Sequence, residues 1–461
     1  MQFLISAAHK SSGKTTLSLG LAAAFRERGL RVQTFKKGPD YIDPIWLQQA
    51  SGRPCYNLDP YLTPWPELAT RYKSALHNAD LALVEGNKGL FDGLALDGSN
   101  SNAALARHLG LPVILVLDAR GMTRGIAPLI LGYQAFDPTI RIVGVILNQL
   151  GGSRHESKLR QVIEHYTKVP VLGALHHRSD FTIEERHLGL IPGNEITHAE
   201  TLLSTLRQAV NEGVDLDALL TVVQQAAPEP STSVRPELVE ERRSIAAPSP
   251  LRIAIAQDRA FGFYYADDLE ALQAAGATLH PFDTLQDSQL PEADALFMGG
   301  GFPESFAPEL SANTALRNKI RSALSAGMPA YAECGGLMYL ARSLKVGDSV
   351  YPMCGVIPGD VEMRPRPVGR GYVHLRPTAD FPWPNPPTAG LRAHEFHYSD
   401  LTGLPDTLTY AWDVERGHGL DGQRDGLVIG HLLAAYTHLR NTGTCTWAQQ
   451  FVAFARACRA S

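Results

Sequence analysis

Hydrophobic and polar residues follow one another along this chain in the order expected of strands, loops and helices. The apolar run at residues 3–5 predicts a buried strand. A short loop of small and polar residues follows, and over residues 17–25 apolar side chains recur in a helical pattern. The chain therefore opens with a strand, a loop and a helix.

The same alternation predicts a parallel sheet across the first 225 residues. Helical patterns lie near 122–135, 154–165 and 197–210. Because the loops after parallel strands meet at the carboxyl edge of a sheet, ligands are expected there. Apolar runs bounded by turn residues predict the further strands, at 32–35, 81–84, 112–118, 142–148 and 169–173.

A second domain is predicted after a linker. Residues 226–250 have no apolar period and are rich in proline, serine and charge. From residue 251 the alternation resumes, with strands at 251–256, 295–298 and 328–333 and helices at 265–275 and 312–326. The expected fold is α/β, with doubly wound and mostly parallel sheets in two domains, 1–225 and 251–461.

Composition narrows the class of protein. A chain of 461 residues is too long for one core, and 44% hydrophobic with 19% charged residues is typical of a globular protein. The net charge of −5 without a basic run argues against a nucleic-acid partner. No apolar run reaches the roughly 18 residues of a membrane span, and the N-terminus has no signal-peptide pattern. Five cysteines without Cys-x-x-Cys spacing argue against disulfides and zinc and favour the cytoplasm.

The loop after the first strand contains a candidate nucleotide-binding motif. Lys14 would supply a positive charge to phosphate, and the Thr15 hydroxyl can reach Mg²⁺. The motif departs from a Walker A loop at Ala8, where that pattern has glycine. Backbone N–H groups at a helix start also favour phosphate. The predicted nucleotide-binding residues here are Ser12, Gly13, Lys14, Thr15 and Thr16.

Charged residues also gather after the second predicted strand. Lys36 and Lys37 are candidates for phosphate or substrate contact, and Asp43 for facing a substrate. Asp40 is a candidate Mg²⁺ ligand together with Thr15. A solvated turn is the alternative for this loop.

Two further strands end in polar residues. Glu85 closes an apolar strand, and because a buried carboxylate needs a partner, we assign it to metal or substrate binding. Asn148 ends another strand, where it would either recognise the nucleotide base or cap a turn.

The second half carries candidate acyl-transfer chemistry. Cys334 lies between a strand and a helix, followed by glycines that allow a sharp turn like a nucleophile elbow. A thiolate there is stabilised by the helix start. His438 follows a predicted strand and is the expected base. Gly300, Gly301 and Gly335 would present backbone N–H groups as an oxyanion hole.

Taken together, these motifs resemble the cobyrinate a,c-diamide synthase family. The N-terminal half looks like its amidoligase domain, which is similar to dethiobiotin synthetase and has a P-loop NTPase-like fold. The C-terminal half looks like its class I glutamine amidotransferase domain. The segments that carry the resemblance are 12–16 (SGKTT), 35–44 (FKKGPDYIDP), 52–59 (GRPCYNLD), 84–86 (VEG), 186–190 (RHLGL), 260–265 (AFGFYY), 299–304 (GGGFPE), 332–340 (AECGGLMYL), 394–399 (HEFHYS) and 435–438 (AYTH).

The resemblance implies a two-part reaction. Glutamine would be hydrolysed at Cys334 through a thioester, with His438 as base. The ammonia would attack a tetrapyrrole carboxylate that MgATP has converted to an acyl phosphate, at side chains a and c in turn. ATP, glutamine and the tetrapyrrole are then the partners, Mg²⁺ is the cofactor, and no tightly bound organic cofactor is expected.

Some positions depart from the family pattern. Class I enzymes usually have His-x-Glu, but here Arg440 follows His438, so the group that orients the histidine is open. Lys10 and Lys88 add positive charge near the edge of the sheet where the active site is expected. Lysines at these positions make the chain resemble a branch of the family thought to amidate sirohaem. Cobyrinate is the first choice of substrate, with sirohaem and hydrogenobyrinate as alternatives.

A different class of function is also compatible with the first domain. Phosphate-binding loops occur in partitioning and switch ATPases, whose output is binding. Cys334 and His438 argue against a switch, which has no use for a glutaminase. The oligomeric state stays open, with a homodimer among the alternatives.

Overall fold

The computed structural model describes residues 1–177, 181, 185–186, 189–196, 199–226 and 250–460. The chain divides into two compact units, Met1–Glu240 and Glu241–Ser461, and each is described by itself. The predicted linker at 226–250 lies outside the described residues, except for its two end residues.

The N-terminal unit is built on a seven-stranded sheet in the order β3-β2-β4-β1-β5-β6-β7, and every neighbouring pair is parallel. Apolar side chains on both faces of these strands are buried, as expected of a parallel sheet covered by helices. The strands are β1 (Gln2–Ala7), β2 (Val32–Lys37), β3 (Tyr56–Leu58), β4 (Leu81–Glu85), β5 (Val113–Asp118), β6 (Ile142–Leu150) and β7 (Val171–His176).

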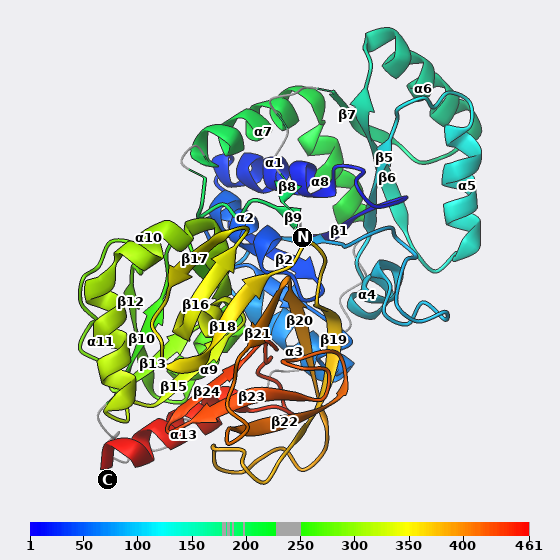
Figure 1. Cartoon of the computed structure of the whole chain (residues 1–461). Helices are drawn as coiled ribbons and strands as arrows, with labels where there is room; N and C mark the ends of the chain where they lie inside the picture. The colour runs from blue at the N-terminus through cyan, green and yellow to red at the C-terminus, as the bar shows by residue number, and fades with distance from the viewer. Residues whose placement is uncertain (178–180, 182–184, 187–188, 197–198, 227–249, 461) are drawn as a thin grey trace. The chain divides into compact units, whose positions relative to one another are not determined.

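Helices cover both faces of this sheet (Figure 1). On one side α1 (Lys14–Glu27) packs against α7 (Ala199–Gly213), with α2 (Ile42–Ser51) and α8 (Leu216–Gln225) nearby. Apolar residues of the remaining four helices form a core with the opposite face. These are α3 (Trp65–Ala75), α4 (Asn102–Leu109), α5 (Ile126–Phe136) and α6 (Ser153–Tyr166). The doubly wound α/β prediction is confirmed for this unit.

One local prediction was wrong. The sequence analysis placed Lys36 and Lys37 in a loop, but both belong to β2 and pair with β3. Both side chains are buried, and carboxylates of neighbouring elements surround Lys36. A charged residue therefore continues the strand because tertiary partners compensate for its burial.

The C-terminal unit contains a nine-stranded sheet in the order β12-β10-β13-β15-β24-β23-β22-β19-β20. Its first five strands are parallel, as predicted, whereas the last four form antiparallel pairs that the sequence pattern did not indicate. The strands are β10 (Leu251–Ala256), β12 (Ala277–Phe282), β13 (Ala295–Met298), β15 (Ala330–Glu333), β19 (Gly369–Pro377), β20 (Leu391–His397), β22 (Thr409–Arg416), β23 (Arg424–Ile429) and β24 (Leu432–Ala435).

Two cores flank this sheet. One includes residues of α10 (Ala307–Ala312), α11 (Thr314–Ser325) and α12 (Gly335–Leu340), and of a smaller sheet. The other includes α9 (Ala266–Ala274) and α13 (Trp447–Ala460). The smaller sheet consists of β17 (Ser349–Pro352), β16 (Ala341–Val346), β18 (Ile357–Met363) and β21 (Ser399–Thr402). Among the described residues, no helix has the length and apolarity needed to cross a membrane.

Candidate active sites

The loop between β1 and α1 approaches Asn148 closely. Gly13 adopts a left-handed conformation with φ of 86°, and a Cβ atom there would lie 2.0 Å from Asn148 Nδ2. That Nδ2 donates a hydrogen bond to the Ser12 carbonyl at 2.9 Å. Ser12 in turn donates to the His9 carbonyl at 2.9 Å. Asn148 therefore braces the loop, and glycine is required at position 13.

Lys14 begins α1 and is buried. Burial lowers the pKa of its ammonium to about 8, with a further lowering from the charge of Lys36. A bound phosphate group would raise this pKa again, since an opposite charge at short range favours the protonated amine. The side chain thus has the properties of a phosphate-binding lysine.

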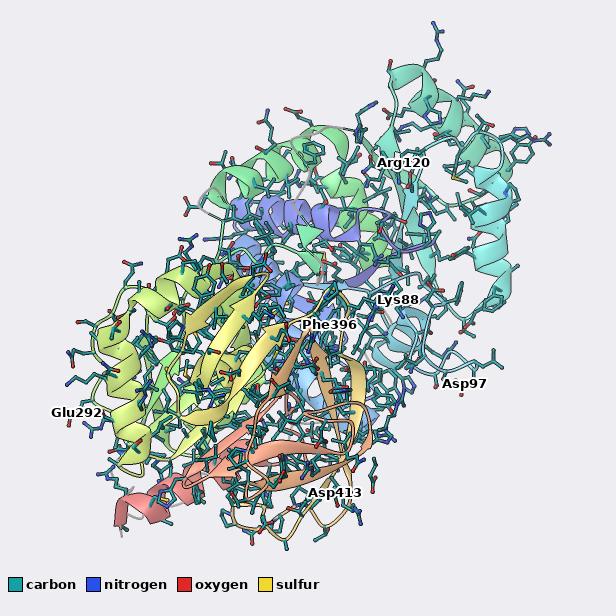
Figure 2. The ribbon with its side chains drawn as sticks, in the orientation of Figure 1. Lys88, Asp97, Arg120, Glu292, Phe396 and Asp413 are labelled. Atoms are coloured by element: carbon teal, nitrogen blue, oxygen red, sulfur yellow. The ribbon has the colours of Figure 1, made fainter. Side chains whose placement is uncertain are left out.

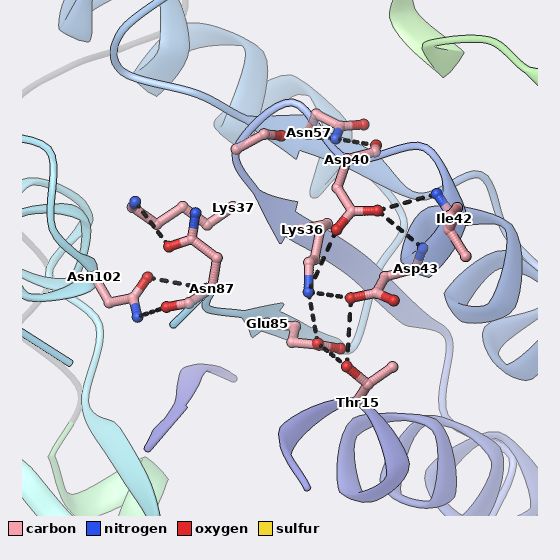
Figure 3. Close-up of polar contacts among 11 residues, drawn as sticks. Thr15, Lys36, Lys37, Asp40, Ile42, Asp43, Asn57, Glu85, Asn87 and Asn102 are labelled. Carbon is pink, nitrogen blue, oxygen red and sulfur yellow. Dashed lines mark hydrogen bonds and ion pairs between the residues drawn. The ribbon is translucent and has the colours of Figure 1, made fainter. Parts of the chain in front are cut away.

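Lys36 lies at the centre of an ionic cluster (Figure 3). Its Nζ atom is 2.7 Å from Glu85 Oε1, forms a short contact with Asp43, and lies 3.9 Å from Asp40. Burial lowers the pKa of Lys36, but the surrounding carboxylates outweigh burial and raise it well above its ordinary value. Lys36 is therefore a protonated counter-ion for Asp43 and Glu85.

Thr15 connects this cluster to the phosphate loop. Its hydroxyl is within hydrogen-bond distance of Glu85 Oε1, at 2.7 Å, and of Asp43 Oδ2, at 3.3 Å. The second oxygen of Glu85 is buried and has no hydrogen-bond partner among the described residues. A hydroxyl beside two carboxylates, one with an unused oxygen, is a suitable ligand set for Mg²⁺.

Asp40 and Asp43 have different surroundings. Asp40 Oδ1 accepts hydrogen bonds at 3.0 Å from the backbone N–H groups of Ile42 and Asp43, at the start of α2. Burial and the charge of Asp43 raise the pKa of Asp40 to about 7. Asp43, assigned from the sequence to the substrate, is the carboxylate that lies beside Thr15 and Glu85. Sequence spacing alone did not distinguish the two.

Lys37 points to a different environment from that of Lys36. Its Nζ donates to Asn87 Oδ1 at 3.2 Å, and Asn102 in turn bonds the backbone of Asn87 (Figure 3). Burial lowers the pKa of Lys37 to about 8. The next residue in that segment, Lys88 (labelled in Figure 2), has a left-handed backbone with φ of 45°. Lys37 and Lys88 add positive charge beside the carboxyl end of β4.

In the C-terminal unit, Cys334 occupies a strained turn between β15 and α12. Its φ of 47° and ψ of −103° are rare for a residue with a side chain. Its N–H donates to the Ala435 carbonyl at 2.7 Å, which attaches the turn to the end of β24. The thiol lies 4.0 Å from the Phe396 carbonyl. This geometry matches the predicted nucleophile elbow.

His438 approaches Cys334 from the segment after β24. Its backbone exchanges hydrogen bonds with His394 of β20, at 2.7 and 3.2 Å. Burial lowers the pKa of His438, but the neighbouring Cys334 and Glu333 side chains outweigh burial and raise it to about 10. Protonated histidine beside a thiol favours the thiolate. The structure thus brings the predicted nucleophile and base together.

Glu333 is the residue that the sequence analysis missed. It is buried at the end of β15, and its Oε2 lies 3.4 Å from His438 Nδ1. The signal was present in the sequence, since a carboxylate closes the apolar strand before Cys334 just as Glu85 closes β4.

The predicted oxyanion glycines lie against the same turn. A Cβ at Gly335 would be 2.9 Å from the Gly301 nitrogen, and one at Gly300 would be 2.6 Å from His438 Cε1. Gly300 and Gly301 form β14 (Gly300–Gly301), which pairs with β11 (Phe261–Phe263). The glycines therefore permit a backbone approach that side chains would block.

Comparison with known protein families agrees with this two-part organisation. Residues 4–191 match the "CobQ/CobB/MinD/ParA nucleotide binding domain". Residues 252–443 match the "CobB/CobQ-like glutamine amidotransferase domain". The matches place the phosphate loop and the Cys334 turn in two different domains.

Curated relatives extend over nearly the whole chain. A protein named cobyrinate a,c-diamide synthase from Magnetococcus marinus is 42% identical over 99% of this chain and 97% of its own length. Proteins of the same name from Methanosarcina acetivorans and Listeria monocytogenes are each 39% identical. They cover 99% and 95% of this chain, and 96% of their own lengths.

Proposed function

This chain belongs to the cobyrinate a,c-diamide synthase family, and from that premise we propose that it amidates the a and c carboxylates of cobyrinate with ATP and glutamine. The observation that carries the proposal is the pairing of a buried cysteine–histidine site with a separate phosphate loop. ATP as substrate and a reduced Cys334 fit a cytoplasmic enzyme.

The C-terminal unit would release ammonia from glutamine. The Cys334 thiolate attacks the side-chain amide carbon, a C–S bond forms, and the nitrogen leaves as ammonia after accepting a proton from His438. N–H groups of Gly300, Gly301 and Gly335 are the proposed donors to the oxyanion, supported by their close approach to the Cys334 turn. Water then cleaves the thioester and returns the thiol.

The N-terminal unit would activate the substrate carboxylate. A carboxylate is a poor electrophile. Transfer of the γ-phosphoryl group to one of its oxygens gives an acyl phosphate, from which ammonia displaces phosphate to form the amide. Lys14 and Lys37 are buried amines whose positive charges would offset the phosphate charge, and phosphate binding would in turn raise their lowered pKa values. Ser12 and Gly13 lie in the loop that Asn148 holds in place, and Thr16 lies in the first turn of α1.

Mg²⁺ fits the acidic residues beside this loop. Thr15, Glu85 and Asp43 would hold it, supported by the buried Glu85 oxygen that has no partner within the described residues. Asp40 instead accepts hydrogen bonds from the backbone at the start of α2. Bound Mg²⁺ would supply positive charge to the transferring phosphoryl group. Lys36 balances these carboxylates and keeps them aligned with Thr15.

Mass spectrometry of the product tests the proposal. The enzyme with MgATP and glutamine is incubated separately with cobyrinate, hydrogenobyrinate and sirohaem. Replacement of OH by NH₂ lowers the mass by about one unit at each carboxylate, so two such losses on cobyrinate alone are expected. The same loss on sirohaem or hydrogenobyrinate would reassign the substrate within the same reaction. ATP hydrolysis with no mass change on any of them would favour a switch ATPase.

Two variants separate the halves of the reaction. Cys334→Ala should abolish glutamine hydrolysis but leave ammonia-dependent amidation. Lys14→Ala should abolish amidation from either nitrogen source while leaving glutamine hydrolysis possible. Retained glutaminase in the first variant, or full ATP turnover in the second, would contradict the assignment of these sites.

A further inference from the structure

Most class I glutamine amidotransferases place a carboxylate two residues after the catalytic histidine, but this chain has Arg440 there. Arg440 instead forms an ion pair with Asp267 at 2.6 Å and lies over the Tyr265 ring. We propose that Glu333, the residue immediately before the nucleophile, is the positioning residue that orients His438. This inference rests on the proposed glutaminase role of Cys334 and His438.

Glu333 is itself held in one orientation. Its Oε1 accepts a hydrogen bond from the Tyr331 hydroxyl at 2.6 Å and one from the Leu439 N–H at 2.9 Å. These two donors occupy one oxygen and leave Oε2 directed at His438 Nδ1, 3.4 Å away. The donors come from the same strand as Glu333 and from the residue after His438, so the carboxylate and the imidazole are fixed relative to each other.

The pairing of strands explains how Glu333 can take the place of the carboxylate that most class I enzymes have two residues after the histidine. In the parallel pair β15–β24, Glu333 lies opposite Ala435. The chain then continues to His438, which bonds back to β20. The end of β15 thus places its last side chain against the histidine and its next residue, Cys334, at the site of attack. One strand end supplies both the nucleophile and the positioning group.

The contact has a chemical consequence. A carboxylate at Nδ1 favours the tautomer that carries hydrogen on Nδ1, which leaves Nε2 to exchange a proton with the sulfur. It also balances the charge of the protonated imidazole in a buried site, where an isolated cation is costly. Glu333 therefore supports the thiolate–imidazolium pair through His438, without contact to the substrate.

Glu333→Gln is the informative variant because it keeps the shape of the side chain. If the glutamine oxygen accepts from Tyr331 and Leu439, its NH₂ group faces Nδ1 and favours the wrong tautomer. We expect glutaminase kcat to fall by at least about 100-fold, the scale of a lost general base. Ammonia-dependent amidation, which does not use Cys334, should stay within about 2-fold of the original enzyme, the usual scatter of a neutral change.

The pH dependence of Cys334 alkylation by iodoacetamide is a second measurement. It would not change if Glu333 had a purely structural role. In the original protein we expect the reactivity of Cys334 to depend on its contact with protonated His438. In Glu333→Gln we expect the alkylation profile to shift to higher pH, because loss of the carboxylate lowers the pKa of His438 and the thiolate loses its cation. An unchanged profile together with unchanged kcat would overturn the proposal.

Matched variants separate positioning from folding. Glu395 is another buried carboxylate of this unit, with oxygens that accept backbone hydrogen bonds from His418 and Gly419 at 2.7 and 2.8 Å. Glu395→Gln should leave the alkylation profile of Cys334 unchanged, and an equal shift in both variants would refute a specific role for Glu333.

If Glu333→Gln does not fold, Tyr331→Phe keeps the ring and removes one donor to Glu333. It should shift the profile in the same direction by a smaller amount, and no shift would count against the proposal.

The ammonia assay also distinguishes this inference from the function on which it depends. If the original enzyme forms no amide from ammonia on any tetrapyrrole, the proposed substrate is wrong. The effect of Glu333→Gln on glutamine hydrolysis and on alkylation still decides the role of Glu333 in that case.

Discussion

Lys36 Nζ lies 2.7 Å from Glu85 Oε1, and both side chains are almost completely buried in the N-terminal unit. A second carboxylate, Asp43, completes the pairing, and Thr15 joins it to the phosphate loop. Because removal of one partner leaves an uncompensated charge inside the protein, this ion pair is strongly coupled to stability.

Lys36→Met should therefore destabilise the N-terminal unit by about 3–5 kcal/mol, the usual cost of breaking a buried pair. For a unit of this size the loss corresponds to a melting temperature lower by roughly 10 °C. Differential scanning calorimetry would measure this decrease, with the transition of the N-terminal unit identified as the one whose melting temperature increases when ATP is added.

The neighbouring lysine supplies the control for this experiment. Lys37 is also buried, but it donates a hydrogen bond to the neutral amide of Asn87, and burial lowers its pKa to about 8. Lys37→Met removes a cation that is costly to bury, so the melting temperature should stay the same or rise. An equal loss of stability in both variants would show that Lys36 has no special counter-ion role.

ATP affinity should depend on pH through Lys14. Burial lowers the pKa of Lys14 to about 8 in the nucleotide-free protein, and phosphate binding favours the protonated amine. Below pH 8 the lysine is already charged, whereas above it each binding event must take up a proton, so affinity should fall as pH rises. Isothermal titration calorimetry of ATP binding at pH 8.5, in buffers of different ionisation enthalpy, should show proton uptake. In Lys14→Met the proton uptake due to Lys14 should be absent.

The paired strand ends show what the sequence could predict. Glu85 was identified because a carboxylate closing an apolar strand needs a partner, and the structure places it beside Thr15. Glu333 obeys the same rule at the end of β15, yet its partner depends on the pairing of β15 with β24, which local patterns do not encode. Local chemistry was therefore predictable, while the identity of long-range partners was not.

The same distinction applies to the fold. Buried apolar runs predicted most of the parallel strands of both sheets, because each such run identifies a strand by itself. The short β3 and the more exposed β12 were not predicted. Lys36 and Lys37 were assigned to a loop because their compensation comes from Glu85, Asp43 and Asn87 on other segments. The antiparallel strands β19, β22 and β23 have more exposed, irregular patterns, which left them without a prediction.

Helix packing in the N-terminal unit makes a prediction about glycine. A Cβ at Gly20 of α1 would lie 2.5 Å from Val210 Cγ2 and 2.8 Å from the Leu206 carbonyl of α7. Gly20→Ala should therefore destabilise the unit by about 1–3 kcal/mol, since the backbone of α7 must move. Gly132 lies in α5, where no atom of another segment of the described residues comes within 4 Å of such a Cβ, so Gly132→Ala should stabilise by about 0.5–1 kcal/mol. Thermal unfolding of the two variants should show shifts of opposite sign.

Gly300 tests the glutaminase geometry without altering a reactive group. A Cβ at this position would lie 2.6 Å from Cε1 of His438, so Gly300→Ala must displace the imidazole or the glycine strand. Because displacement by about 1 Å can reduce a rate by roughly 100-fold, we expect glutamine hydrolysis to fall by that order while ammonia-dependent amidation continues. Steady-state assays with each nitrogen source would measure both, with Cys334→Ala as the reference for complete loss of glutaminase. Glutamine hydrolysis at the original rate in Gly300→Ala would mean that His438 does not hold this position during the reaction.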